Sequence, residues 1–180
     1  MSGIIFYIYK KMPTKKDCIA ADFHLPYINL VQEENVVKAI KKNAAQVKKL
    51  LKTIPGKKID YAYADGKWTI KEILQHLIDA ERVFTYRAVT FARKDTTSLP
   101  GFDEKIWAQN AKIKNRKWKD LIEEFKTVRK STELLFQSFD DEQLLSSGMA
   151  FNKTINVLAL GFICAGHSAH HIKIIKEKYL

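Results

Sequence analysis

Three of the five histidines lie within five consecutive positions near the C-terminus: His167, His170 and His171. In a helix, residues four positions apart lie on one face, with Cβ atoms about 5 to 6 Å apart. His167 and His171 can therefore offer two imidazoles to one metal ion, whereas the side chain of His170 points about 100° away. Because the same spacing arises by chance on many helices, the pair needs support from its surroundings.

The surroundings strengthen the interpretation, because the segment that carries these histidines is strongly apolar. A buried imidazole needs a partner for its ring nitrogens. His76 is the candidate third ligand, since it borders the apolar face of an earlier predicted helix whose centre can face the end of the last one. Three neutral imidazoles with one or two open positions suit Zn²⁺ or another late divalent metal at a catalytic site. The alternative is that His76 is a core histidine bonded to a neighbour.

The elements that must position these residues are long helices, with almost no predicted strand. Pro55 and Gly56 end the first helix, and the Thr69 to Glu72 stretch has the sequence of a capping box at the start of the second. The last helix is apolar around most of its first half, so we expect the others to enclose it. Apolar side chains recur at steps of three and four over residues 36–54, 70–93, 118–140 and 154–178. These patterns predict an all-α fold, a four-helix bundle.

A long connection, residues 94–116, joins the second and third helices, and a connection of that length usually has a task. We expect a short helix from Asp103 to Asn110 within it, which would bury Trp107. Asp103 could close over the site as a catalytic acid or base. As a loop or helix-cap residue it needs no such role. We expect Trp68, like Trp107 and Trp118, in the core, and His24 at the surface.

The charge balance is the unusual feature of the composition. The chain has 180 residues, with 31 Lys and Arg against 20 Asp and Glu and a formal net charge of +11. Such an excess is typical of proteins that bind nucleic acid or anionic membranes. Here the basic residues fall on the outward faces of all four predicted helices, without the interleaved aromatic residues of a stacking platform. We therefore expect a solvated shell rather than a nucleic-acid partner, and at most a preference for anionic small molecules.

Other features of the sequence bear on ligands and location. Arg82 and Arg87, together with Glu81, could anchor an anionic substrate or form ion pairs along their helix. Cys18 and Cys164 lack any metal-type spacing, so a reduced cytoplasmic protein is the default expectation. No segment is long enough to cross a bilayer, and we expect no membrane partner.

Three stretches of the chain, in the correct order, resemble the signature segments of the DinB/YfiT-like superfamily: residues 68–87, 99–107 and 166–179. The resemblance covers residues 26–180, which would form a DinB-like four-helix bundle domain. Residues 1–25 would then be an N-terminal extension, partly irregular. Because the tract from Met12 reads like a second chain start, we expect residues 1–11 to be dispensable.

The resemblance implies a single divalent metal, often nickel or zinc, held by His76, His167 and His171, and often a homodimer. Characterised members of the family include thiol transferases that use bacillithiol, a mycothiol-dependent isomerase and proteins named as metal-dependent hydrolases. A low-molecular-weight thiol is thus a possible cosubstrate. The sequence departs from the commonest family pattern at Ser168, where close relatives often carry Glu; the ligands are intact, but any role of that acid is in doubt.

Metal ligands of this kind usually donate their outer N–H to a nearby acceptor. Glu72 and Asp79, on either side of His76, are the candidates, although helix capping for Glu72 and plain solvation for Asp79 explain them more simply. The leading hypothesis is a metal-dependent enzyme that activates a thiol or water for transfer to, or hydrolysis of, a small electrophilic substrate. The alternatives are a non-catalytic metal-binding bundle and, third, a basic nucleic-acid-associated protein.

Overall fold

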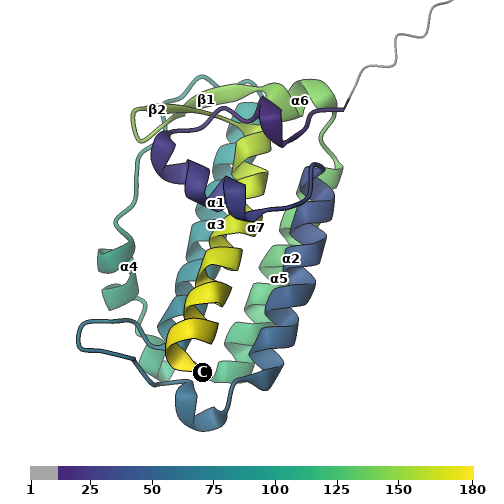
Figure 1. The fold of residues 1–180 in the computed structure, drawn as a ribbon. Helices are drawn as coiled ribbons and strands as arrows, with labels where there is room; N and C mark the ends of the chain where they lie inside the picture. Colours follow the sequence, from purple (N-terminus) through teal and green to yellow (C-terminus); the bar gives the residue numbers. More distant parts are fainter. Residues whose placement is uncertain (1–11) are drawn as a thin grey trace, which may run out of the picture.

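Four long helices form the body of the molecule, as the sequence predicts (Figure 1). The computed structural model describes residues 12–180, so the expectation that residues 1–11 are dispensable falls outside the described part. The bundle consists of α2 (Val36–Thr53), α3 (Ile70–Ala92), α5 (Trp118–Gln137) and α7 (Val157–Ile174). The all-α fold, the four-helix bundle and the long connection after the second helix are confirmed.

Shorter elements decorate this bundle. They are the helices α1 (Leu25–Leu30), α4 (Glu104–Asn110) and α6 (Asp141–Leu145), and the antiparallel strands β1 (Ser147–Ala150) and β2 (Lys153–Asn156). Four 3-10 turns lie at Lys15–Asp17, Asp22–His24, Gly56–Lys58 and Ile113–Asn115, and a π-helical turn at Ile175–Tyr179 follows α7. None of the helices in the described part of the chain has the length and apolar character needed to span a bilayer.

The start of the last long helix differs from the prediction. Residues 153–156 pair with β1, and the helix begins only at Val157, after Asn156 has capped it by accepting the amide N–H of Ala159 at 2.9 Å. The hairpin turns through Phe151 and Asn152, which both adopt positive φ. The helix cannot start earlier, because residues 153–156 are extended and pair with β1.

Helix starts elsewhere follow the expected side-chain chemistry. The Thr69 hydroxyl accepts the Glu72 amide at 3.2 Å, and the Glu72 carboxylate accepts the Thr69 amide at 2.7 Å, which completes the capping box. Asn35 caps α2 in the same manner through the amide of Lys38. Such caps satisfy amides that have no partner within the helix.

Helix α7 is the central element, and its first half is buried on all sides, as expected. It packs against α1, α2 and α3, with α1 lying across it (Figure 1). A Cβ at Gly166 would lie 2.0 Å from the carbonyl oxygen of Tyr27, and one at Gly161 would lie 2.4 Å from Val36 Cγ2. Only glycine at these positions allows the neighbouring elements to approach so closely.

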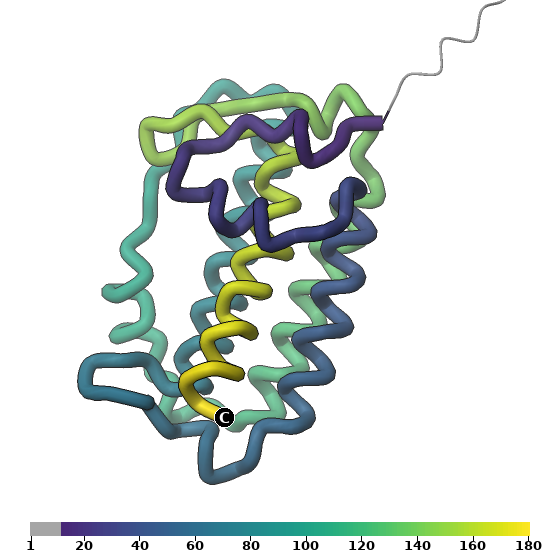
Figure 2. Tube along the Cα trace, viewed as in Figure 1, coloured from purple at the N-terminus to yellow at the C-terminus, as the bar shows by residue number. Residues whose placement is uncertain are grey.

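The N-terminal residues of the described chain run along the hairpin before α1 crosses α7 (Figure 2). The side chain of Asn156 holds them there, because it accepts the amide of Ile19 at 3.1 Å and donates to the carbonyl of Asp17 at 2.8 Å. Residues 21–27 thereby become part of the wall of the central cavity described below. The division of the chain at residue 25 remains a prediction.

Candidate metal centre

Helices α3 and α7 bring three histidines together inside the bundle. His76 comes from α3, and His167 and His171 lie one turn apart on α7. The Nε2 atom of His167 lies 3.0 Å from Nε2 of His76 and 3.2 Å from Nε2 of His171. The three ligand atoms all lie within 4.8 Å of one another. The structure thus assembles the three residues that the family resemblance assigns as ligands.

The donor set fits a divalent metal ion. A single proton between two nitrogens can satisfy only one pair of rings, whereas one cation can accept a lone pair from each of the three. Nitrogen ligands at about 2.0 to 2.1 Å from a tetrahedral zinc ion lie about 3.3 Å apart, close to the two separations that involve His167, 3.0 and 3.2 Å. The buried Nδ1 of His171 has no partner among the described residues.

The protonation state of the three rings also suits metal binding. Burial lowers the pKa of His76 to about 4, and burial together with the neighbouring His76 lowers that of His171 to about 3. Burial and the adjacent histidines hold the pKa of His167 well below its ordinary value. All three imidazoles are therefore neutral near pH 7, and the neutral ring is the form that binds metals.

The three histidines face a cavity of about 440 Å³ whose wall is mainly aromatic. The ring of Trp68 lies 4.8 Å from that of His76, and Tyr27 meets His167 edge-on at 5.3 Å. Trp68 thus borders the site instead of serving only as core. The aromatic members of the wall are Phe23, Tyr27, Trp68, Phe84, Phe102 and Phe151.

Besides the three clustered histidines, six polar side chains line the cavity: His24, Arg87, Glu104, Lys153, Thr154 and His170. Glu104 lies in the 99–107 segment of the family resemblance, but the sequence analysis gave it no role. Lys153 carried no sequence signal, because it comes from a hairpin with no chemical motif. The expectation that His24 is a surface residue was wrong: it is half-buried, and its Nδ1 is enclosed. The segment before α1 packs over the bundle, and no local pattern predicts that contact.

The other sequence-predicted site residues lie apart from the imidazoles. Asp103 is exposed and caps α4 by accepting the amides of Lys105 and Ile106 at 2.9 and 3.0 Å. The Glu72 carboxylate belongs to its capping box, and Asp79 accepts the side-chain amide of Gln75 at 2.9 Å. The caps made by Asp103 and Glu72 are the structural roles that the sequence analysis offered as alternatives, whereas Asp79 is half-buried and hydrogen-bonded rather than simply solvated.

The tryptophan of the connecting segment also differs from its prediction. Trp107 was expected in the core, but it is 43% exposed and packs against Phe102 with ring centroids 4.9 Å apart. Helix α4, which carries it, is short and stands beside the bundle (Figure 1). The bundle covers only one side of this short helix, so Trp107 remains partly open to solvent.

A buried ion pair lies next to the histidine cluster. Arg129 on α5 contacts Glu81 on α3 at 2.7 Å, and both side chains are 3% exposed. Arg129 also donates to the Ser168 hydroxyl at 2.7 Å and to the Cys164 carbonyl at 3.2 Å. Ser168, where the sequence departs from the family pattern, therefore connects α7 to α5 through Arg129. The carboxylate that pairs with Arg129 comes from Glu81 on α3.

The lowered histidine pKa values predict how the metal-free protein responds to acid. Between about pH 6.5 and 4, the rings of His76, His167 and His171 bind protons in the unfolded chain but stay unprotonated in the folded one. The free energy of unfolding therefore falls as the pH falls. Each such ring contributes a slope of about 1.36 kcal/mol per pH unit in that window. Urea denaturation of metal-free protein at about pH 7, 6 and 5 measures the slope. His171→Leu should reduce it by about one proton, and a free energy of unfolding unchanged across this range would contradict the prediction.

Comparison with known proteins agrees with the architecture. Residues 39–175 match the family model described as the DinB superfamily. The chain is 23% identical over 154 residues to the Bacillus subtilis (strain 168) protein named "Putative metal-dependent hydrolase YfiT", covering 83% of this chain and 85% of that one. A solved structure described as "YfiT from Bacillus subtilis is a probable metal-dependent hydrolase with an unusual four-helix bundle topology" matches with a TM-score of 0.68 at 20% identity, over 79% of this chain and 82% of that one. The chain belongs to the DinB superfamily.

Proposed function

We propose that this protein is a metal-dependent enzyme that activates water or a thiol for attack on a small electrophilic substrate. His76, His167 and His171 would hold the metal, with nickel or zinc best suited to three imidazole donors. The observation that carries the proposal is the convergence of three Nε2 atoms, with separations of 3.0 and 3.2 Å, at the wall of an aromatic cavity of about 440 Å³. That volume is in the range of small-molecule sites.

The residues of the site have separable roles in such a reaction. A divalent metal held by His76, His167 and His171 would lower the pKa of a bound water or thiol. The aromatic wall binds the apolar part of the substrate and excludes bulk water. Glu104 is the carboxylate of the cavity wall, and its charge raises the pKa of His76 against the larger effect of burial. Its Oε atoms can accept the proton that the nucleophile loses.

Hydrolysis and thiol transfer differ in what attacks the substrate. The names given to the matched YfiT protein and its structure support hydrolysis. The family resemblance adds thiol transfer, and an open metal position accepts either water or a thiolate. Both reactions need the same three histidines, so the metal is the part of the proposal to test first.

The test begins with protein purified without an affinity tag. Elemental analysis is expected to find about one equivalent of nickel or zinc per chain. The protein is then assayed with p-nitrophenyl esters for hydrolysis, and with monochlorobimane and low-molecular-weight thiols for transfer. Turnover should disappear after treatment with 1,10-phenanthroline and return when the metal is restored.

The two negative outcomes have different meanings. A protein that takes up neither nickel nor zinc would refute the metal site and the enzyme with it. A full complement of metal without turnover in either assay would support the alternative, a non-catalytic metal-binding bundle.

The proposal extends to assembly and location. We expect a homodimer, as the family resemblance implies, and sedimentation velocity measures it. Cys18 and Cys164 are both free thiols in the structure, which suits the proposed cytoplasmic location. Nucleic acid is not a proposed partner; a salt-dependent shift of duplex DNA at physiological ionic strength would overturn that view.

A further inference from the structure

Arg87 is a buried cation without a counter-charge. Its side chain lies in the cavity wall, the residue is 6% exposed, and Nη2 donates to the carbonyl oxygen of Pro100 at 2.8 Å. Within residues 12–180, no carboxylate lies within ion-pair distance of it, and burial lowers its pKa. A charge removed from water without a partner is costly unless a ligand supplies the opposite charge.

Two other arginines of the same bundle show the usual arrangement. Arg129 is as buried as Arg87, but Glu81 lies 2.7 Å away. Arg82 precedes Arg87 by five positions on α3 and contacts Glu124 at 2.7 Å while remaining half exposed. The fold therefore supplies carboxylates to Arg82 and Arg129, which do not border the central cavity, and leaves the buried Arg87 without one at the cavity wall.

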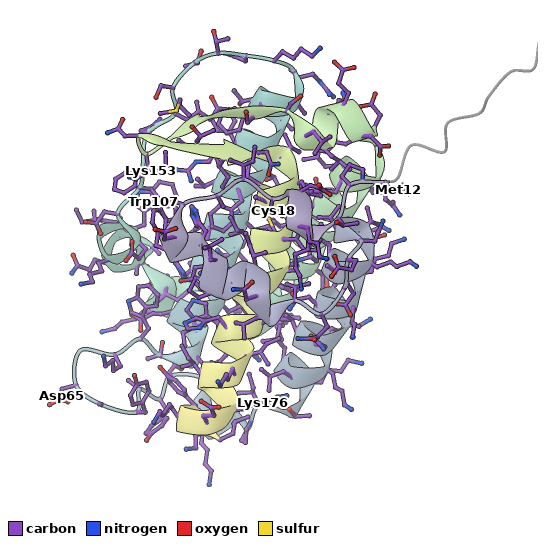
Figure 3. The ribbon with its side chains drawn as sticks, turned by 45° about the horizontal axis from the view of Figure 1, so that its top comes forward. Met12, Cys18, Asp65, Trp107, Lys153 and Lys176 are labelled. Carbon is purple, nitrogen blue, oxygen red and sulfur yellow. The ribbon has the colours of Figure 1, made fainter. Side chains whose placement is uncertain are left out.

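Two further polar groups lie on the same cavity. His24 has a buried Nδ1 with no partner among the described residues, and its pKa falls to about 4 through burial and through the charge of Arg87. At neutral pH this ring is uncharged and can donate one N–H bond. Lys153, at the start of β2, adds an ammonium group at the cavity wall, on the side of the molecule that also carries Trp107 (Figure 3).

The histidine cluster and Arg87 lie at different heights of the cavity. His76 and Arg87 are both on α3, three helical turns or about 16 Å apart along its axis, and Ala80 and Phe84 line the cavity between them. A bound molecule would therefore meet the histidine cluster at one end and the positive charge of Arg87 at the other, with the ring of Phe84 between them.

We propose that the cavity binds a small organic molecule through its carboxylate, which Arg87 holds as an ion pair with His24 and Lys153 beside it. The rest of the molecule would lie against the aromatic wall and extend toward the three histidines. The proposal rests on the proposed function only in taking this cavity as the substrate site. A single carboxylate fits this site because the planar guanidinium of Arg87 can bind both carboxylate oxygens, and because Lys153 is exposed to solvent and needs no second negative charge.

The test uses the full chain freed of metal with 1,10-phenanthroline, so that no metal can bind the probe. The probes are 3-phenylpropionate, its neutral amide 3-phenylpropanamide, and phenyl phosphate, and binding is followed by NMR titration at about pH 7. We expect 3-phenylpropionate to bind the wild type at least about tenfold more tightly than the amide, as a charge-assisted hydrogen bond implies. The variant Arg87→Met should lose this preference. The matched control Arg82→Met removes an arginine of the same helix outside the cavity and should keep it.

Several outcomes would overturn the inference. Equal binding of acid and amide to the wild type, or a preference that survives Arg87→Met, would show that Arg87 does not hold the anion. Absence of saturable 3-phenylpropionate binding up to its solubility limit would do the same, and tighter binding of phenyl phosphate would replace the carboxylate with a phosphate. If Arg87→Met fails to fold, Arg87→Lys keeps the charge but loses the planar guanidinium and should weaken acid binding several-fold. Since the protein contains no metal here, failure of the metal chemistry leaves this test intact.

Discussion

Replacing His167 with alanine is expected to abolish stoichiometric metal binding. His167 is the central member of the cluster, because its Nε2 is the atom that approaches both His76 and His171, at 3.0 and 3.2 Å. Two imidazoles on different helices would remain, with no third protein ligand among the described residues. Loss of a direct ligand should exceed the roughly 10- to 100-fold loss of affinity that follows loss of an outer partner. Elemental analysis, and competition with a chromophoric chelator, measure the effect.

His170 provides the matched control for this variant. It lies on the same helix and borders the same cavity, but it does not belong to the group of three converging ligand atoms. His170→Ala should therefore keep the metal and any activity that depends on it. If His167→Ala retains a full equivalent of metal, or if both variants lose metal equally while circular dichroism shows intact helices, the assignment of His167 as a ligand is wrong.

Glu81→Ala is expected to destabilise the fold by about 3 to 5 kcal/mol, the usual cost of leaving one member of a buried ion pair alone. Arg129 would keep its bonds to Ser168 and Cys164 but lose its carboxylate, with 3% of its side chain exposed. Burial raises the pKa of Glu81 from its ordinary value, while Arg129 and the Thr132 hydroxyl, which donates at 2.6 Å, oppose that rise. Urea denaturation at about pH 7 measures the change in the free energy of unfolding.

Two further variants separate the buried charge from other causes. Glu81→Ala combined with Arg129→Met removes both charges and should recover most of the lost stability. Lys130→Ala breaks the surface pair with Glu133, whose members lie 2.9 Å apart, and should change stability by less than about 1 kcal/mol. A double variant as unstable as Glu81→Ala would show that lost packing, rather than the unpaired guanidinium, causes the effect. Because Arg129 bonds to α7 beside His167, Glu81→Ala should also weaken metal binding.

Local patterns in the amino-acid sequence determine much of the fold. Periodic apolar residues predict the four long helices, because a helix that buries one face must repeat apolar residues every three to four positions. The Thr69 to Glu72 capping box is also predicted from local sequence, because its hydrogen bonds join residues three positions apart. Where a pattern is short, prediction fails: the two four-residue strands have no recognisable period, and Trp107 lies on a short helix that packs on only one side.

Local sequence patterns predict only part of the metal site. His167 and His171 are one helical turn apart, so the sequence alone places their side chains together. His76 lies 91 residues before His167, and only the packing of α3 against α7, or the family resemblance, joins it to them. Only the tertiary structure brings the cavity wall together, because His24, Arg87 and Lys153 come from separate elements. The sequence alone determined which side chains lie on each face of a helix. The packing of the helices and their connections decided which of those side chains share one cavity. Contacts between distant segments produce no periodic pattern in the sequence, so they could not be predicted from it.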